Sequence, residues 1–151
     1  MKALQFLAVV LTALALIPGG AHLLAMPNKL GFDETAYFTV QGIYRGWALL
    51  GILLVAAIAA DLALAVGSRR QPVPFRLALA GALCLAATLA VFFLWTHPAN
   101  QATANWTAVP DDWAALRLQW EYSHAANAIL TFIALCLVTL SALRWRPPRS
   151  Q

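Results

Sequence analysis

Four long apolar stretches alternate with short polar segments along the chain. The stretches cover approximately residues 4–26, 44–66, 76–96 and 121–143, and the helix that contains the last stretch is predicted to begin at residue 112. Each is about as long as the ~20 residues that a helix needs to cross the hydrocarbon core of a bilayer. The polar segments between them, 27–43, 67–75 and 97–111, are too short to fold as separate domains. The pattern therefore predicts an all-α fold, a bundle of four transmembrane helices that forms one domain over residues 1–151.

Composition and charge agree with this pattern and orient the bundle. Of the 151 residues, 62% are hydrophobic and 11% are charged. Basic residues that flank short loops stay on the cytoplasmic side of a membrane. One side of the predicted bundle collects Lys2, Arg69, Arg70, Arg76, Arg144, Arg146 and Arg149, whereas the other has Lys29, Arg45 and Arg117. We therefore expect both termini in the cytoplasm, segment 67–75 as a cytoplasmic loop, and segments 27–43 and 97–111 as outer loops.

The net charge of +4 is explained by the same bias. Basic residues at the cytoplasmic face contact anionic lipid headgroups, so the lipid bilayer is the expected partner and a nucleic acid is not. The first stretch also has features of a secretory signal peptide, because Lys2 precedes an apolar run and Pro18-Gly19-Gly20-Ala21 follows it. A retained helix is the favoured interpretation, since four spans satisfy the charge bias of every loop.

Local signals predict where several helices begin and end. Residues 26–31 have the composition of a turn, and Asp33 is a candidate N-cap for a helix that runs on into the second span. Tyr37, Gln41 and Tyr44 would share one face of that helix. Pro98 is expected to end the third helix. The fourth helix, 112–143, would be about 48 Å long at ~1.5 Å per residue, so it is expected to extend beyond the membrane on the outer side.

Apart from Glu121 at the outer edge of the fourth apolar stretch, Asp61 is the one acidic residue inside these stretches. An ionisable residue in a span is by default a functional candidate. Asp61 could equally reach Arg69 and Arg70, about a turn and a half away, so its role stays open.

All three histidines, His22, His97 and His124, are predicted at the outer third of three different helices. The fourth helix adds a polar and aromatic stripe, because Arg117, Trp120, Glu121, His124, Asn127 and Thr131 follow helical spacing. In lipid such a stripe must face the interior of the bundle. An interfacial histidine and an aromatic belt are the simpler explanations of each residue taken singly.

Imidazole and carboxylate groups are also ligands of zinc, iron and copper. These residue types therefore predict a mononuclear metal site formed by His22, His97, Glu121 and His124 as one alternative. A di-iron centre of the usual bundle type is not expected, because it needs further glutamates and the only other one is Glu34.

Two segments carry a family resemblance. The late segment contains Pro98-Ala99-Asn100 and then Trp113-x-x-Leu116-Arg117-x-x-Trp120-x-x-x-His124, and the early one covers residues 24–45 with His22 upstream. In these residues the chain resembles the anthrone oxygenase-like family of small four-helix membrane proteins, many of them bacterial. Family members often carry an arginine shortly after the histidine, where this chain has Ala125, Ala126 and Asn127.

The resemblance implies a membrane-embedded oxygenase of a bacterial inner membrane that acts on an apolar aromatic or quinol-type ring without a well-defined cofactor. Such chemistry needs a base, a cation and a dry aromatic pocket. The candidate catalytic residues are His124, Arg117, His22 and Asn100. The candidate substrate-binding residues are Trp106, Trp113, Trp120, Arg45 and Tyr44.

Two other classes stay open at the level of sequence. One is a redox module that holds a haem or one transition metal with two of the histidines. The other is a non-catalytic membrane subunit in which the stripe only packs the fourth helix into the bundle. The sequence does not decide between a homo-oligomer and a complex with a partner subunit.

Overall fold

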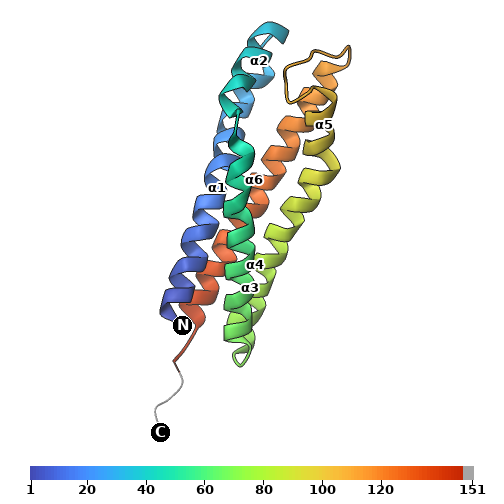
Figure 1. Ribbon diagram of the computed structural model, residues 1–151. Helices are drawn as coiled ribbons and strands as arrows, with labels where there is room; N and C mark the ends of the chain where they lie inside the picture. The colour runs from blue at the N-terminus through green and yellow to red at the C-terminus, as the bar shows by residue number, and fades with distance from the viewer. Residues whose placement is uncertain (148–151) are drawn as a thin grey trace.

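The computed structural model describes residues 1–147, and Arg149 of the basic group lies outside the described residues. The chain forms four long helical rods that lie side by side (Figure 1). The rods are α1 (Lys2–Leu30), η2 (Trp47–Leu50) with α3 (Gly51–Ser68), α4 (Pro72–Val91) with η3 (Phe92–Thr96) and α5 (His97–Ala102), and α6 (Trp113–Arg144). Each rod is long and apolar enough to cross a membrane, which confirms the prediction of four helices of membrane-spanning length.

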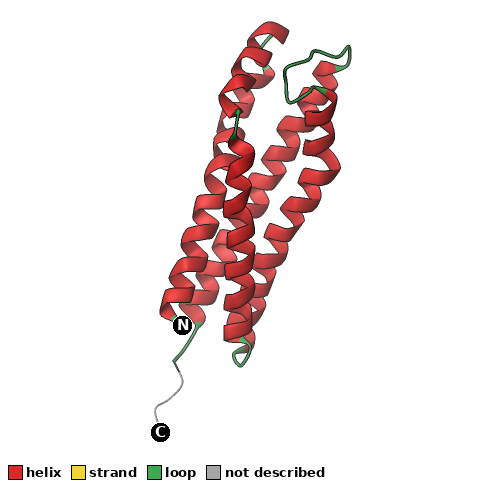
Figure 2. Cartoon of the chain, viewed as in Figure 1, coloured by secondary structure: helices red, strands yellow, loops and turns green. Residues whose placement is uncertain are grey.

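Throughout the described part of the chain the secondary structure is helical, with no strand (Figure 2). The first and last helices, α1 and α6, are neighbours, and α4 also packs along α6. Small residues allow the close approach of these helices. A Cβ atom added at Gly19 of α1 would lie 3.4 Å from the Cα atom of Ala128 of α6. Backbone contact of this kind is typical of helix packing in membranes.

The second rod does not begin as one continuous helix, so that prediction is wrong. Helix α2 (Glu34–Gln41) is separate, and the short 3₁₀ turn η1 (Gly42–Tyr44) follows it. Gly46 then takes a φ of +86°, a left-handed conformation that favours glycine and turns the chain into η2. The N-cap prediction is confirmed, because the Asp33 side chain accepts a hydrogen bond of 2.8 Å from the backbone N–H of Ala36.

Two prolines that were expected to lie at breaks are accommodated within rods. Helix α1 runs through Pro27 to Leu30, so the turn predicted at residues 26–31 is wrong. The third rod likewise continues past Pro98 to Ala102, because the π-helical segment η3 lies directly before it. There the N–H of His97 bonds to the carbonyl of Phe92, and this wider turn makes room for the proline ring.

The connection between α5 and α6 contains three consecutive residues in the left-handed region. Ala104, Asn105 and Trp106 have φ values of 47°, 57° and 63°. Two hydrogen bonds hold this conformation: Asn105 N–H donates to the Asn100 carbonyl at 2.7 Å, and Trp106 N–H donates to the Thr103 hydroxyl at 3.1 Å. The loop thereby places Trp106 in the interior of the bundle end, where its side chain is buried.

Asp61 lies inside the bundle and is fully buried. Both of its carboxylate oxygens are within reach of the Thr12 hydroxyl of α1, at 3.3 and 3.4 Å. The alternative in which Asp61 reaches Arg69 and Arg70 is therefore wrong, because its side chain points toward α1 and not toward the end of α3.

Candidate functional site

A cavity of about 1130 Å³ lies in the half of the bundle that carries α2 and α5. Each rod contributes to its lining: Gly19 and His22 from α1, Trp47 and Leu54 from the second rod, Phe92 and Asn100 from the third, and Trp120, His124 and Asn127 from α6. The volume is somewhat above the roughly 300–1,000 Å³ of typical ligand pockets, and most of the lining is apolar or aromatic. The cavity is therefore the candidate binding site.

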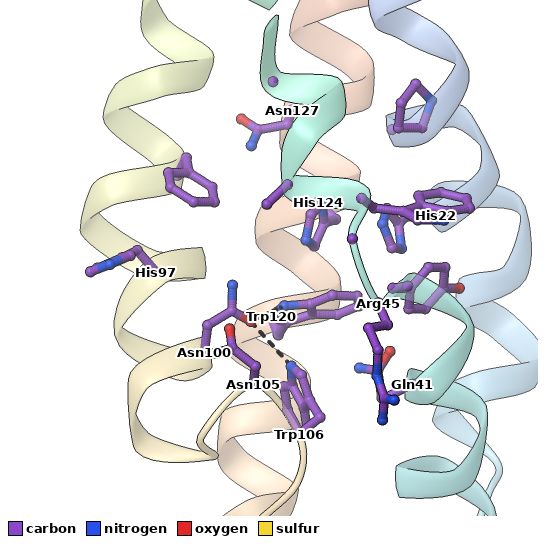
Figure 3. Close-up of a pocket in the computed structure, with 18 of the residues that line it drawn as sticks. His22, Gln41, Arg45, His97, Asn100, Asn105, Trp106, Trp120, His124 and Asn127 are labelled. Atoms are coloured by element: carbon purple, nitrogen blue, oxygen red, sulfur yellow. Dashed lines mark hydrogen bonds between the residues drawn. The ribbon is translucent and has the colours of Figure 1, made fainter.

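Two of the three histidines meet at one wall of this cavity (Figure 3). The rings of His22 and His124 are stacked, with centroids 4.1 Å apart and planes at 29°. Trp120 presents its ring to both, with centroids 4.9 Å from His22 and 4.2 Å from His124. His22 is buried, and its Nδ1 atom has no hydrogen-bond partner within residues 1–147. His22 of α1 therefore meets Trp120 and His124 of the predicted stripe at this wall.

The third histidine, His97, also lines the cavity but lies apart from this pair. His97 packs against Phe92 and Phe93, with ring centroids 5.9 and 6.1 Å away, and Figure 3 shows it pointing away from His22 and His124. Glu121 does not join the histidine pair either, because it forms an ion pair with Lys29. The described residues contain no group of three or more histidine, cysteine or acidic side chains that could hold a metal ion. A metal centre formed by His22, His97, Glu121 and His124 therefore does not fit this structure.

Asn100 holds two tryptophan rings in the wall of the cavity. Its side-chain oxygen accepts hydrogen bonds from the indole N–H groups of Trp120 at 2.8 Å and of Trp106 at 3.2 Å. The two indole rings have centroids 5.7 Å apart. Because the oxygen is occupied by the indoles, the amide N–H groups of Asn100 are the donors that it can offer to a ligand.

A buried polar network lies behind this aromatic wall. Lys29 and Glu121 form an ion pair with a distance of 2.8 Å, and both side chains are almost fully buried. The Tyr37 hydroxyl donates to Glu121 Oε1 at 2.9 Å, and Gln41 Nε2 donates to the Tyr37 hydroxyl at 2.7 Å. Burial and the neighbouring Glu121 carboxylate raise the pKa of Tyr37 well above its usual range, so this phenol remains a hydrogen-bond donor at neutral pH.

The Lys29 ammonium of this ion pair also contacts the aromatic wall. The Lys29 ammonium lies 4.9 Å from the centroid of the Trp120 ring and 5.0 Å from that of Tyr44. Cation–π contacts of this kind are stronger when water is excluded. Tyr44 in turn contacts His22, with ring centroids 4.2 Å apart. Burial is the main cause that raises the pKa of Tyr44, with Glu121 second.

The remaining candidate residues divide between the cavity and an outer layer. Arg45, Tyr44 and Trp106 line the cavity. Of these three, only Arg45 is exposed. Arg117 and Trp113 do not line it. The Arg117 guanidinium lies 4.8 Å from the centroid of the Trp113 ring and donates a hydrogen bond of 2.7 Å to the Phe32 carbonyl. Arg117 therefore joins α6 to the segment before α2.

Lys29, Tyr37 and Gln41 belong to the buried polar network, but they were not predicted as site residues. The spacing of Tyr37 and Gln41 on one helical face was a usable signal, since both are buried and hydrogen-bonded. Lys29 gave no such signal, because it lies in a segment with the composition of a turn and its partner is on the last helix.

Comparison of the chain with protein-family models, with curated proteins and with solved structures gives no match. The resemblance to the anthrone oxygenase-like family therefore stays a prediction. The cavity and the residues that line it are the features that indicate a function.

Proposed function

We propose that the chain is an integral membrane protein that binds an apolar aromatic or quinol-type molecule in the cavity and oxygenates it. The observation that carries the proposal is the stacked pair of His22 and His124 in an aromatic wall, with a buried ring nitrogen that has no partner in the described chain. Burial of a group that can accept a proton, inside a large apolar pocket, is typical of a reaction site.

The proposed orientation places both termini in the cytoplasm of a bacterium and the cavity toward the outer face of the inner membrane. Its support is the distribution of charge, since Lys2, Arg70 and Arg144 belong to the end of the bundle away from the cavity. Helix α6 has 32 residues and is about 48 Å long at ~1.5 Å per residue, which exceeds the roughly 30 Å core of a bilayer. Its first turns would extend beyond the membrane on the outer side.

The proposed reaction converts a phenol that has a hydrogen on its para carbon, or the keto tautomer of such a phenol, into a quinone. A histidine of the pair removes the phenolic proton, and the resulting anion carries charge on its para carbon. That carbon bonds to one atom of O₂, and the hydroperoxide loses water. One phenol and one O₂ thus give one quinone and one H₂O, with O₂ as the only oxidant.

The chain offers separate groups for each requirement of this reaction. His22 and His124 are the candidate bases. Arg45 and the amide N–H groups of Asn100 line the cavity and would stabilise the phenolate oxygen. The rings of Trp106 and Trp120 would hold the apolar ring and exclude water. Arg117 and Trp113 would act as positioning residues, since they contact α2 and the preceding segment.

Binding without chemistry is the second candidate, because an aromatic-walled cavity of this size can hold a lipid-soluble ligand without a base. A metal or haem redox module has less support, because two axial ligands of a haem lie on opposite faces of its ring, whereas the imidazoles of His22 and His124 are stacked on each other with centroids 4.1 Å apart.

The test is oxygenation of anthrone by the purified protein in lipid nanodiscs. Oxygen consumption and the absorbance of anthraquinone are recorded and corrected for empty nanodiscs. His124→Ala and His22→Ala are expected to lower turnover about 10²- to 10⁴-fold, the range of a lost general base. His97→Ala is the matched control, because it removes an imidazole from the lining of the same cavity whose ring points away from the pair, and it is expected to keep turnover near that of the unaltered chain.

Equal turnover in His124→Ala and His97→Ala would overturn the proposed catalysis. Saturable quenching of tryptophan fluorescence by anthrone without oxygen consumption would support the second candidate instead.

A further inference from the structure

One side of the cavity faces the lipid between α3 and the third rod. Val55 of α3 and Phe93 of η3 both line the cavity, yet they are 59% and 61% exposed. Both residues lie within rods that are long and apolar enough to cross a membrane. Their exposed surface therefore meets acyl chains in the bilayer, so this side of the cavity connects with lipid.

Small residues keep this side open. Gly46, Ala48 and Gly51 line the cavity on the second rod. A Cβ atom added at Gly46 or Gly51 would meet no atom within 4 Å, so there is free space beside the backbone. In Figure 1 the second and third rods are close together at the short connection after α3 and separate toward η2 and α5. The opening therefore lies at the level of the cavity.

The polar end of the cavity offers acceptors. Glu121 is a carboxylate paired with Lys29, so the Tyr37 hydroxyl must donate its single proton to it. The lone pair of Tyr37 can then only accept, which fixes Gln41 with its amide nitrogen toward Tyr37. The side-chain oxygen of Gln41 is left buried without a partner in the described chain, and Gln41 lines the cavity.

A second unpartnered atom belongs to another residue of the cavity lining. The Nδ1 atom of buried His22 has no hydrogen-bond partner within the described residues, and His22 also lines the cavity. A buried acceptor without a donor is unfavourable, so a ligand that donates to both atoms would bind more tightly than one that cannot.

We propose that the ligand is an aromatic ring with two hydroxyl groups and an apolar tail. Its hydroxyl groups donate to Gln41 Oε1 and His22 Nδ1, its ring lies between the aromatic walls, and its tail leaves between Val55 and Phe93 into the bilayer. The cavity volume of about 1130 Å³ leaves room for a ring and the first part of a tail. This assignment rests on the proposed function, since it names the substrate class of the same site.

Tail passage is tested by equilibrium binding of 5-pentadecylresorcinol in nanodiscs, measured as quenching of tryptophan fluorescence. Val55→Trp should fill the opening and weaken binding about tenfold or more, which corresponds to at least about 1.4 kcal/mol. Val66→Trp is the matched control, because Val66 is 58% exposed on the same helix and does not line the cavity. Equal affinity of the two variants would overturn the proposed path of the tail.

Hydroxyl recognition is tested with the unaltered chain, so it does not depend on a variant that folds. The dimethyl ether of 5-pentadecylresorcinol has the same tail and no donors, and it is expected to bind about tenfold or more weakly. Equal affinity of the diol and its ether would overturn the assignment. Both assays measure binding alone, so a loss of oxygenation in His124→Ala, or its absence altogether, bears on the proposed function and not on this ligand class.

Discussion

The buried ion pair between Lys29 and Glu121 leads to a quantitative prediction about stability. The pair joins α1 to α6 at 2.8 Å, and both side chains are almost fully buried. Taking two charges out of water is costly, and their attraction compensates only while both are present. Lys29→Met and Glu121→Gln should therefore each lower the free energy of unfolding by about 3–5 kcal/mol, because each leaves one buried charge without a partner.

The double variant Lys29→Met/Glu121→Gln should be more stable than either single variant. It removes both charges, and the amide oxygen at position 121 can still accept the hydrogen bond that Tyr37 donates to Glu121 Oε1. We expect a coupling energy of several kcal/mol, within the roughly 1.5–7 kcal/mol measured for close buried charge pairs. A surface ion pair would instead give about 0–1 kcal/mol.

The measurement is unfolding in detergent micelles by titration with sodium dodecyl sulfate, followed by tryptophan fluorescence. Trp120 lies 4.9 Å from the Lys29 ammonium and is a local reporter. Lys2→Met is the control, since Lys2 is exposed at the far end of α1 and should leave the unfolding free energy nearly unchanged. Additive effects of the two single variants, or single variants as stable as the unaltered chain, would refute the reasoning.

Three further predictions use the same unfolding assay. Gly46→Ala should cost about 1–2 kcal/mol because φ is +86°, whereas Gly42→Ala, at a φ of −59°, should be near neutral; equal losses would contradict the role of the left-handed turn. Ala104→Gly should raise stability by about 0.5–1 kcal/mol by relieving a left-handed alanine, and a decrease would show that the loop is not strained. Asn100→Leu should lower the free energy of unfolding by about 1–3 kcal/mol for each indole N–H left without an acceptor, and it should change the near-ultraviolet circular dichroism of Trp106 and Trp120. Asn100→Asp keeps the acceptor, so its near-ultraviolet spectrum should match that of the unaltered chain.

The helices could be predicted because their signals are local. Each apolar stretch became a rod, and α6 begins and ends within one residue of its predicted limits. Asp33 caps α2 as expected, since an N-cap needs only its own side chain and the next turn. The two proline predictions failed because contacts beyond the local sequence continue both rods. Lys29, two residues after Pro27, is held in the bundle by its ion pair with Glu121. The π-helical turn η3 accommodates Pro98.

The site could be predicted only in part. His22, Trp120 and His124 come together because residues at one depth on adjacent helices meet when their polar faces point inward. His97 was expected with them, but it follows η3 and packs against Phe92 and Phe93 instead. Glu121 was assigned to a metal, whereas it is paired with Lys29. Contacts between distant residues depend on the packing of whole helices, which the spacing within one helix does not contain.

The contact between α1 and α6 also has a consequence for biosynthesis. Glu121 and Tyr37 are separated by 84 positions along the chain, and Lys29 lies still earlier. A ribosome completes the first three rods before it makes the segment that contains Glu121. During that interval the Lys29 ammonium lacks its partner Glu121, and the Gln41–Tyr37 pair has no final acceptor. Closure of the cavity must therefore follow the insertion of the last helix, so any factor that delays this insertion leaves the aromatic wall unassembled and open to lipid.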